Sequence, residues 1–294
     1  MDCLRVNAFG KLRMQFNGAE LTAFPTRHVE ELLGFLLLHP QQHHNREKLI
    51  EMLWPHASRV NVRARFSTVL WRLRRSLDSI GLEADDCLEV SRQALCFLPP
   101  ADWSFDVQEF QDALQCLRRQ EDDREREQIL LRVVASYRGE LFDGLYANWC
   151  LLERERLARL YLRAAGQLML LLMRRKAYEE ALTYGHSILE HDPLREEVHR
   201  ALMYCYWQLG QFTYATEQYQ TCAELLMNEL RILPRQATVD LYQQIMTDRF
   251  ATSQTEADVD DPAHVQLQHA FAEFQMAGQR LSRMLIDLET HQTE

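Results

Sequence analysis

The sequence predicts a mainly α-helical protein with a small β part near its N-terminus. Ten glycines and eight prolines in 294 residues are few, and hydrophobic residues make up 47% of the chain, which is typical of a folded, largely helical protein. Short segments near the N-terminus alternate apolar and polar residues, as half-buried strands do. Beyond residue 103 the pattern changes to long amphipathic helices that include a repeat of 34 residues.

The N-terminal segments predict strands followed by two helices. Residues 4–9 and 12–16 alternate around Gly10-Lys11, which indicates short antiparallel strands. Residues 28–39 follow as an apolar helix that stops at Pro40. Gly34 within it indicates a close contact with another helix, because glycine costs about 1 kcal/mol relative to alanine in a helix. Asn45 can cap a second helix that ends at Pro55.

The next stretch, residues 59–81, reverses the charge of the chain. It holds six arginines and no acidic residue before Asp78, although the formal net charge of the protein is −10. One apolar stripe at helical spacing predicts a packed face, and a polar face lies opposite. The apolar stripe is Val62, Phe66, Val69, Leu70, Leu73 and Leu77, and the opposite face carries Asn61, Arg65, Thr68, Arg72 and Arg75, with Ala64 and Trp71 among them.

Arginine presents a fork of donors that suits phosphate oxygens and the O6/N7 edge of guanine, so this helix is predicted to lie in a DNA major groove. The alternative is a solvated basic face on an ordinary surface helix. An acidic loop then leads to residues 87–90 and 94–98, which alternate on either side of Ser91-Arg92-Gln93 and predict a hairpin with Arg92 at its tip. Together these elements predict a winged helix-turn-helix domain over residues 1–100.

The repeat predicts the second domain, residues 101–248. Tyr178 and Ala181 are matched 34 residues later by Phe212 and Ala215, a period typical of tetratricopeptide repeats, in which stacked helix pairs form a concave surface. The loop over residues 137–149 is expected to tuck into the helical layer. The late position of Pro234 predicts a lengthened helix over residues 215–232.

Both halves resemble one family. The order of strands, three helices and hairpin resembles the winged-helix domain of OmpR-type response regulators, and LIEMLWP followed by VLWRLRRSL resembles the N-terminal domain of the SARP family, the Streptomyces antibiotic regulatory proteins. Residues 181–212 and 225–245 resemble the bacterial transcriptional activator domain that follows in that family. The sequence departs from the family at Trp71, where a small polar residue is more usual.

The resemblance implies a sequence-specific activator of transcription that binds double-stranded promoter DNA. In this interpretation the helical domain contacts RNA polymerase. Bases are contacted by Arg65, Thr68, Arg72 and Arg75, and phosphates by Arg59, Arg63, Arg74 and Arg92. The alternative is a tetratricopeptide-type adaptor whose winged helix does not bind DNA. The six arginines without an intervening acid favour the activator.

Other classes of function find little support. Residues 1–98 carry 13 basic and 11 acidic residues, which leaves a net charge of −12 for the rest, so DNA affinity depends on clustered arginines rather than bulk charge. Nothing assembles a nucleophile, a base and oxyanion donors, so no enzyme and no cofactor are expected. His39, His43 and His44 are expected to be solvated rather than metal-bound, and the seven scattered cysteines to be reduced thiols. With no signal peptide and no membrane span, a cytoplasmic, nucleoid-associated bacterial protein is expected.

The C-terminal tail is predicted to hold a linker, residues 249–262, and an amphipathic helix, residues 263–290. The apolar residues of this helix follow a heptad spacing and call for a partner helix: Leu267, Phe271, Phe274, Leu281, Leu285 and Leu288. That partner is either the chain's own helical domain or a second chain in a homodimer.

Overall fold

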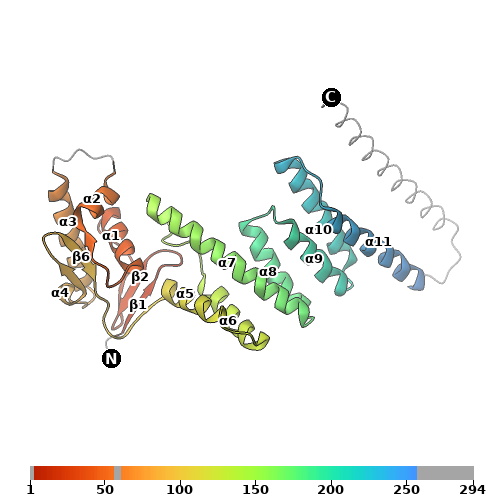
Figure 1. Ribbon diagram of the computed structural model, residues 1–294, viewed down its shortest axis with the longest axis horizontal. Helices are drawn as coiled ribbons and strands as arrows, with labels where there is room; N and C mark the ends of the chain where they lie inside the picture. Colours follow the sequence, from red (N-terminus) through yellow and green to blue (C-terminus); the bar gives the residue numbers. More distant parts are fainter. Residues whose placement is uncertain (1–2, 56–60, 257–294) are drawn as a thin grey trace, which may run out of the picture. The chain divides into compact units, whose positions relative to one another are not determined.

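The computed structural model describes residues 3–55 and 61–256, with side chains described up to residue 250. Residues up to Leu241 form one compact unit, in which a small β-rich part precedes a series of helices (Figure 1). The second unit begins at Tyr242, and its described residues continue helix α11, Gln236–Glu256. Within the described residues, no helix combines the length and apolar character that a membrane span needs.

The N-terminal sheet combines three strands of the first predicted domain with one strand that follows residue 100. Its order is β3-β2-β1-β7, with β1 at Leu4–Asn7, β2 at Arg13–Phe16, β3 at Ala19–Leu21 and β7 at Trp103–Phe105. The first three are antiparallel, whereas β7 runs parallel to β1 and pairs Trp103 with Leu4. This sheet therefore has strands on both sides of the expected domain boundary at residue 100, because β7 follows that residue.

The helices and hairpin that follow confirm the winged helix-turn-helix. They are α1 at Arg27–Leu38, β4 at His44–Asn45, α2 at Arg46–Leu53, α3 at Val62–Asp78, α4 at Ala84–Cys87, β5 at Leu88–Val90 and β6 at Ala94–Phe97. A second sheet has the order β4-β6-β5. Asn45 caps α2 as predicted, since its side chain accepts hydrogen bonds from the amides of Glu47 and Lys48. The acidic segment after α3 forms the short helix α4 rather than a loop.

The helical part is a sequential stack in which each helix from α5 to α10 packs against the next (Figure 1). The six helices are α5 at Asp106–Leu117, α6 at Asp123–Ser136, α7 at Asn148–Arg174, α8 at Tyr178–His191, α9 at Glu196–Gln208 and α10 at Phe212–Leu225. The repeat is confirmed, because Ala181 and Ala215 are both fully buried at equivalent positions of α8 and α10. Small alanines there let neighbouring helices approach closely.

The lengthened helix predicted over residues 215–232 is only partly α-helical. After Leu225 the chain forms a π-helical turn, η1, at Leu226–Leu230, and Arg231 then takes a left-handed conformation with φ of 58°. The tail differs in a related way. Residues 249–256 of the expected linker belong to α11, while residues 257–262 and the expected helix over 263–290 lie outside the described residues.

The loop over residues 137–147 contacts both the winged helix and the helical part, whereas the sequence predicted that it packs into the helical layer. Leu141 forms a β-bridge with Phe9, and the ring of Phe142 lies where a Cβ on Gly34 would be 3.2 Å away. The guanidinium of Arg154 in α7 donates hydrogen bonds to the carbonyl oxygens of residues 141, 142 and 145, each at 3.0 Å. The glycine of α1 thus marks a close contact, as the sequence predicted, but the partner is a loop.

A carboxylate completes this junction. Asp106, the first residue of α5, accepts hydrogen bonds from the amides of Ala8 at 2.9 Å and Phe9 at 3.0 Å. Burial raises the pKa of Asp106, and the amide hydrogen bonds oppose that shift. The first helix of the helical part is therefore anchored on the end of strand β1.

Candidate nucleic-acid interface

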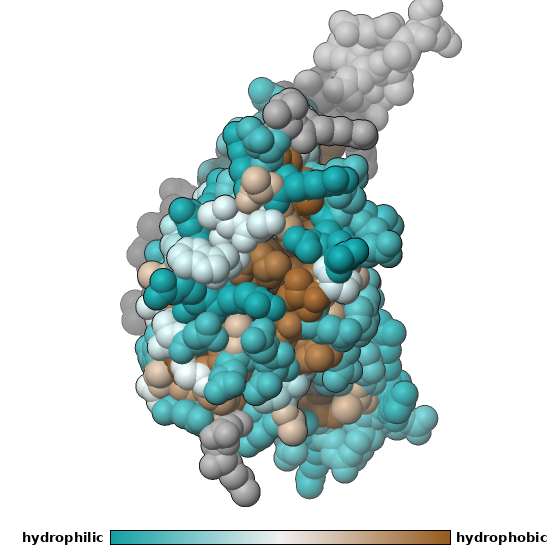
Figure 2. All heavy atoms as spheres, turned by 90° about the vertical axis from the view of Figure 1, so that its left-hand side faces the viewer, coloured by the Kyte–Doolittle hydropathy of each residue, from teal (hydrophilic) through white to brown (hydrophobic). Residues whose placement is uncertain are grey.

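Helix α3 presents the two faces that the sequence predicts. Its buried residues are Val62, Phe66, Val69, Leu70, Leu73, Ser76 and Leu77, which include the whole predicted apolar stripe. On the other side Arg65, Thr68 and Arg75 are exposed and Arg72 is half-buried. Figure 2 looks at the side of the molecule on which α3 and α4 lie, where polar side chains surround a strip of apolar ones.

Two of the predicted site arginines are held by carboxylates. The Arg63 Nη2 atom lies 3.0 Å from Glu47 Oε1 of α2, and the Arg74 Nη2 atom lies 3.1 Å from Asp85 Oδ1 of α4. Positions 63 and 74 are eleven residues apart, about three helical turns, so both lie on one flank of α3. The predicted phosphate contacts of these two arginines therefore compete with ion pairs inside the winged helix.

The remaining arginines are on the other flank and on the wing. Within the described residues, no carboxylate lies within ion-pair distance of Arg65, Arg72, Arg75 or Arg92. Arg59 lies outside the described residues. The arginines of α3 without an ion-pair partner among the described residues are thus Arg65 and Arg75, which are exposed, and Arg72, which is half-buried.

Thr68 and Trp71 lie on the same exposed face as these arginines. The Thr68 hydroxyl donates to the Ala64 carbonyl oxygen at 3.1 Å, which leaves the oxygen free to accept a further hydrogen bond. The Trp71 side chain is 56% exposed, and the guanidinium carbon of Arg75 lies 5.3 Å from the centre of its ring. This cation–π contact was not predicted, although the spacing of four residues on a helix is a signal for it.

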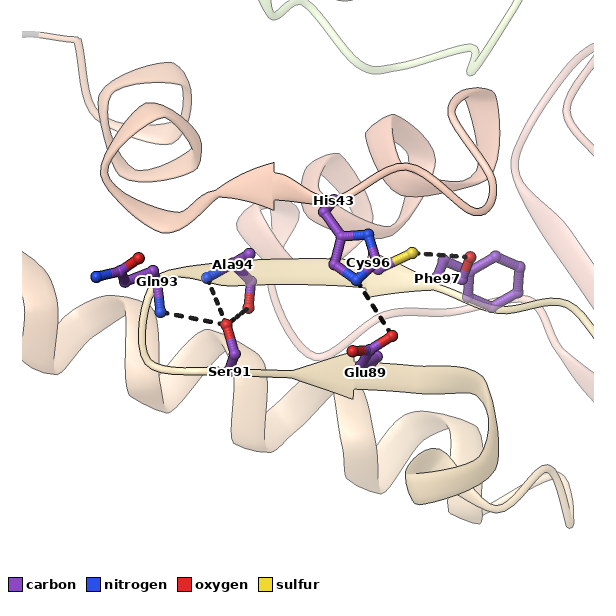
Figure 3. A network of polar contacts seen from close by, with 7 residues as sticks. All are labelled: His43, Glu89, Ser91, Gln93, Ala94, Cys96 and Phe97. Atoms are coloured by element: carbon purple, nitrogen blue, oxygen red, sulfur yellow. Dashed lines mark hydrogen bonds and ion pairs between the residues drawn. The ribbon is translucent and has the colours of Figure 1, made fainter.

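The wing is a braced hairpin (Figure 3). At its tip the Ser91 hydroxyl oxygen accepts hydrogen bonds from the amides of Ala94 at 2.8 Å and Gln93 at 3.3 Å, which fixes the turn around Arg92. His43 Nε2 lies 3.2 Å from a carboxylate oxygen of Glu89 on β5, across the same sheet. Arg92 itself is exposed. A basic side chain is thus presented on a hydrogen-bonded turn.

Arg46 at the start of α2 ties this wing to α3. Its Nη1 donates to the Ser91 carbonyl oxygen at 3.2 Å, its amide donates to the Gln93 carbonyl oxygen at 2.8 Å, and its guanidinium carbon lies 5.2 Å from the Phe66 ring centre. Sequence reasoning missed this residue because its partners are about 20 and 45 positions away. Arg46 fixes the wing relative to the helix that carries the exposed arginines.

The three neighbouring histidines are not arranged as a metal site. His39 Nδ1 is 2.9 Å from the Phe35 carbonyl oxygen, and His43 pairs with Glu89. Burial and then the neighbouring His39 lower the pKa of His44. Within the described residues, no group of three or more His, Cys, Asp or Glu side chains has the arrangement for a metal ion.

The helical part carries a separate concave feature. A cavity of about 640 Å³ lies between α7 and α9, with Leu162, Met169 and Val198 on its walls and Arg163 and Arg200 among its polar residues. Cavities of this size and apolar character are the usual binding sites on protein surfaces. The helical part therefore has an apolar recess of the size that ligands usually occupy.

Comparison with known proteins agrees with both parts of the fold. A family model described as bacterial transcriptional activator domain matches residues 105–246. The structure of Mycobacterium tuberculosis EmbR in complex with a low-affinity phosphopeptide superposes with a TM-score of 0.68 at 17% identity, over 84% of this chain and 66% of that chain. That likeness shows a shared fold, and this chain spans 66% of the length of its relative.

A thermophilic TPR protein of Thermus thermophilus matches at 16% identity over 68% of this chain and 88% of that chain, but the TM-score of 0.27 is too low to indicate a shared fold. No curated protein matches the sequence significantly.

Proposed function

We propose that the chain is a sequence-specific DNA-binding activator of transcription, as the match of residues 105–246 to the bacterial transcriptional activator domain and the resemblance to the SARP family indicate. Helix α3 enters the major groove of promoter DNA, where Arg65, Thr68, Arg72 and Arg75 contact bases. Arg92 on the wing contacts a phosphate. The protein acts in the bacterial cytosol on the nucleoid.

The observation that carries this proposal is the exposed, carboxylate-free face of α3. Its arginines lie on a helix whose opposite face is buried, and within the described chain no acidic side chain neutralises Arg65, Arg72 or Arg75. Arg72 and Arg75 are three residues apart, and like charges at that spacing destabilise a helix by a few tenths of a kcal/mol, so an anionic partner accounts for this pair better than stability does. Duplex DNA supplies that partner with regularly spaced phosphates.

The ion-paired arginines have a smaller part in this proposal. Arg63 and Arg74 reach phosphates only by exchanging Glu47 and Asp85 for DNA, so each contributes less to binding than an unpaired arginine. Arg59 is proposed as a phosphate contact on its sequence position alone. The helical part contacts RNA polymerase and contributes little direct DNA affinity, because its net negative charge repels phosphate.

The test is a binding titration of the full chain with genomic duplex fragments, followed by sequencing of the bound fraction. If about four to six phosphates are neutralised, log K falls with log salt concentration at a slope of about −4 to −5. Arg72→Ala is expected to relax the preferred sequence at one or two positions, whereas Arg92→Ala weakens binding to all sequences alike. Arg132→Ala, an exposed arginine of α6, is the matched control and changes neither.

Transcription from a selected site with purified bacterial RNA polymerase tests the second half of the proposal. The full chain is expected to raise transcript yield, and Arg72→Ala to reduce that effect. Absence of binding even at low salt would support the adaptor with a winged helix that does not bind DNA. Binding without any effect on transcription would remove the polymerase contact from the proposal and retain the DNA-binding role.

A further inference from the structure

Trp71 is an unusual side chain for the exposed face of a helix. It is 56% exposed, the largest exposure of any tryptophan among the described residues, and it lies between Thr68 and Arg75 on the side opposite the buried stripe. Leaving an indole in water forgoes the burial that makes tryptophan stabilising in a fold. Its exposure leaves the indole ring available to whatever α3 contacts.

The cation–π contact with Arg75 makes Trp71 part of the proposed binding face. The guanidinium carbon of Arg75 is 5.3 Å from the ring centre, and the two residues are one helical turn apart. This contact limits the rotamers that Arg75 samples before binding, which reduces the entropy lost when the guanidinium is fixed on a ligand.

The chemistry of the major groove specifies what this pair can read. Thymine is the base that presents an apolar group there, the 5-methyl, and apolar side chains distinguish thymine through it. Guanine presents the O6 and N7 acceptors that suit arginine. Four residues of helix span about 6 Å, which corresponds to roughly two base-pair steps of about 3.4 Å.

We propose that Trp71 recognises a thymine through its 5-methyl group and holds Arg75 in place for a guanine about two base pairs away. This inference rests on the proposed DNA-binding function and adds a specificity-determining residue to it.

The test begins with the duplex that the full-length chain selects from a random library. Each thymine of that duplex is replaced in turn by deoxyuridine, which removes only the 5-methyl group, and affinity is measured by fluorescence anisotropy. One position is expected to lose about three- to fivefold in affinity, the worth of one buried methyl group. Trp71→Ala is expected to lose about tenfold on the selected duplex and to be insensitive to deoxyuridine at that same position.

The Arg75 part is tested by a double-mutant cycle. Trp71→Ala and Arg75→Ala together are expected to cost less than the product of their separate losses, because the two side chains act as a unit. Tyr214→Ala is the matched control, since Tyr214 is an aromatic of similar exposure, 57%, on α10, and its loss leaves affinity and sequence preference unchanged. Thermal melts of each variant verify that it is folded. Melting temperatures close to that of the wild type are expected, because the replaced side chains are exposed.

The outcomes separate this inference from the function on which it rests. If the wild type binds a preferred duplex but tolerates deoxyuridine at every position, or if Trp71→Ala retains the same sensitive position, the thymine contact is wrong and the DNA-binding function stands. If the affinity loss of the double variant equals the product of the losses of Trp71→Ala and Arg75→Ala, the two side chains act independently and the proposed coupling between them is wrong. A wild type that binds no duplex overturns the proposed function itself.

Discussion

The contact between Gly34 and Phe142 predicts a stability effect that changes sign with the background. Phe142 is fully buried, and a Cβ built on Gly34 would lie 3.2 Å from the Cε2 and Cζ atoms of its ring. In the wild type, Gly34→Ala gains about 1 kcal/mol of helix propensity. It also forces the ring to move in a filled core, and such overpacking costs about 1–3 kcal/mol. A net destabilisation of about 1 kcal/mol is expected.

Removing the ring removes the clash. Phe142→Ala alone is expected to cost about 3–5 kcal/mol, the usual range for a buried phenylalanine. Alanine is the right replacement because the backbone of Phe142 has a φ of 47°, which glycine would relax and so confuse the comparison. In that background Gly34→Ala should stabilise the protein by about 1 kcal/mol, since only the propensity term remains.

The assay is guanidinium unfolding of the full chain, followed by circular dichroism, for the wild type and the three variants. A coupling free energy of about 1–3 kcal/mol between the two positions is expected. The variants are compared at equal m-values, so that differences in midpoint report differences in stability. Gly34→Ala that raises stability equally in both backgrounds would refute the close contact between α1 and the loop.

Three further predictions concern the helical part and the junction. Gly185→Ala should cost about 1–3 kcal/mol of stability, because its Cβ would meet a methyl of the buried Leu202. Gly166→Ala, whose Cβ would meet nothing within 4 Å, should gain about 1 kcal/mol. Paired urea titrations compare the two variants, and equal effects would contradict the packing of α8 on α9. A fragment ending at Pro100 should fail to melt cooperatively, because it lacks strand β7, Asp106 and the loop that covers α1. A sharp calorimetric transition of this fragment would show instead that the winged helix folds alone. Burial lowers the pKa of His199 below 6.5, so the unfolded state binds the proton more readily than the folded state. The contribution of His199 to stability is therefore fully present above pH 6.5 and should be lost as the pH falls below 6.5. Melting temperatures measured against pH should fall less in His199→Gln than in the wild type, and an unchanged profile would refute this assignment.

The neutral state of His199 has a structural basis as well. Its Nε2 lies 2.9 Å from the Pro193 carbonyl oxygen and its Nδ1 lies 2.5 Å from the Gln218 side-chain nitrogen. A neutral ring with the proton on Nε2 donates to the first and accepts from the second, whereas a protonated ring would turn one acceptor into a donor facing a donor. Burial thus sets the sign of the pH dependence, because it lowers the pKa of His199, whereas the hydrogen bond with the Pro193 carbonyl and the charge of Glu196 oppose that shift.

Local periodicity carried most of the information that the sequence holds about this fold. The apolar stripe of α3, the hairpin around Arg92 and the equivalent positions Ala181 and Ala215 are set by neighbours within a few residues or by a regular spacing. Burial of one face of a helix or strand depends on that spacing alone, which is why these predictions were confirmed. The exposed arginine face of α3 belongs to the same class.

Pairing between distant segments was decided by the tertiary structure. Glu47 and Asp85 neutralise Arg63 and Arg74 because α2 and α4 pack on one flank of α3, and no spacing rule links residues on separate elements. In the same way, strand β7 joins the N-terminal sheet and Phe142 fills the space beside Gly34. Composition and periodicity determined which elements form and which faces they bury. Which arginines remain available to a ligand depended on long-range contacts, because charges are neutralised by neighbours in space rather than in sequence.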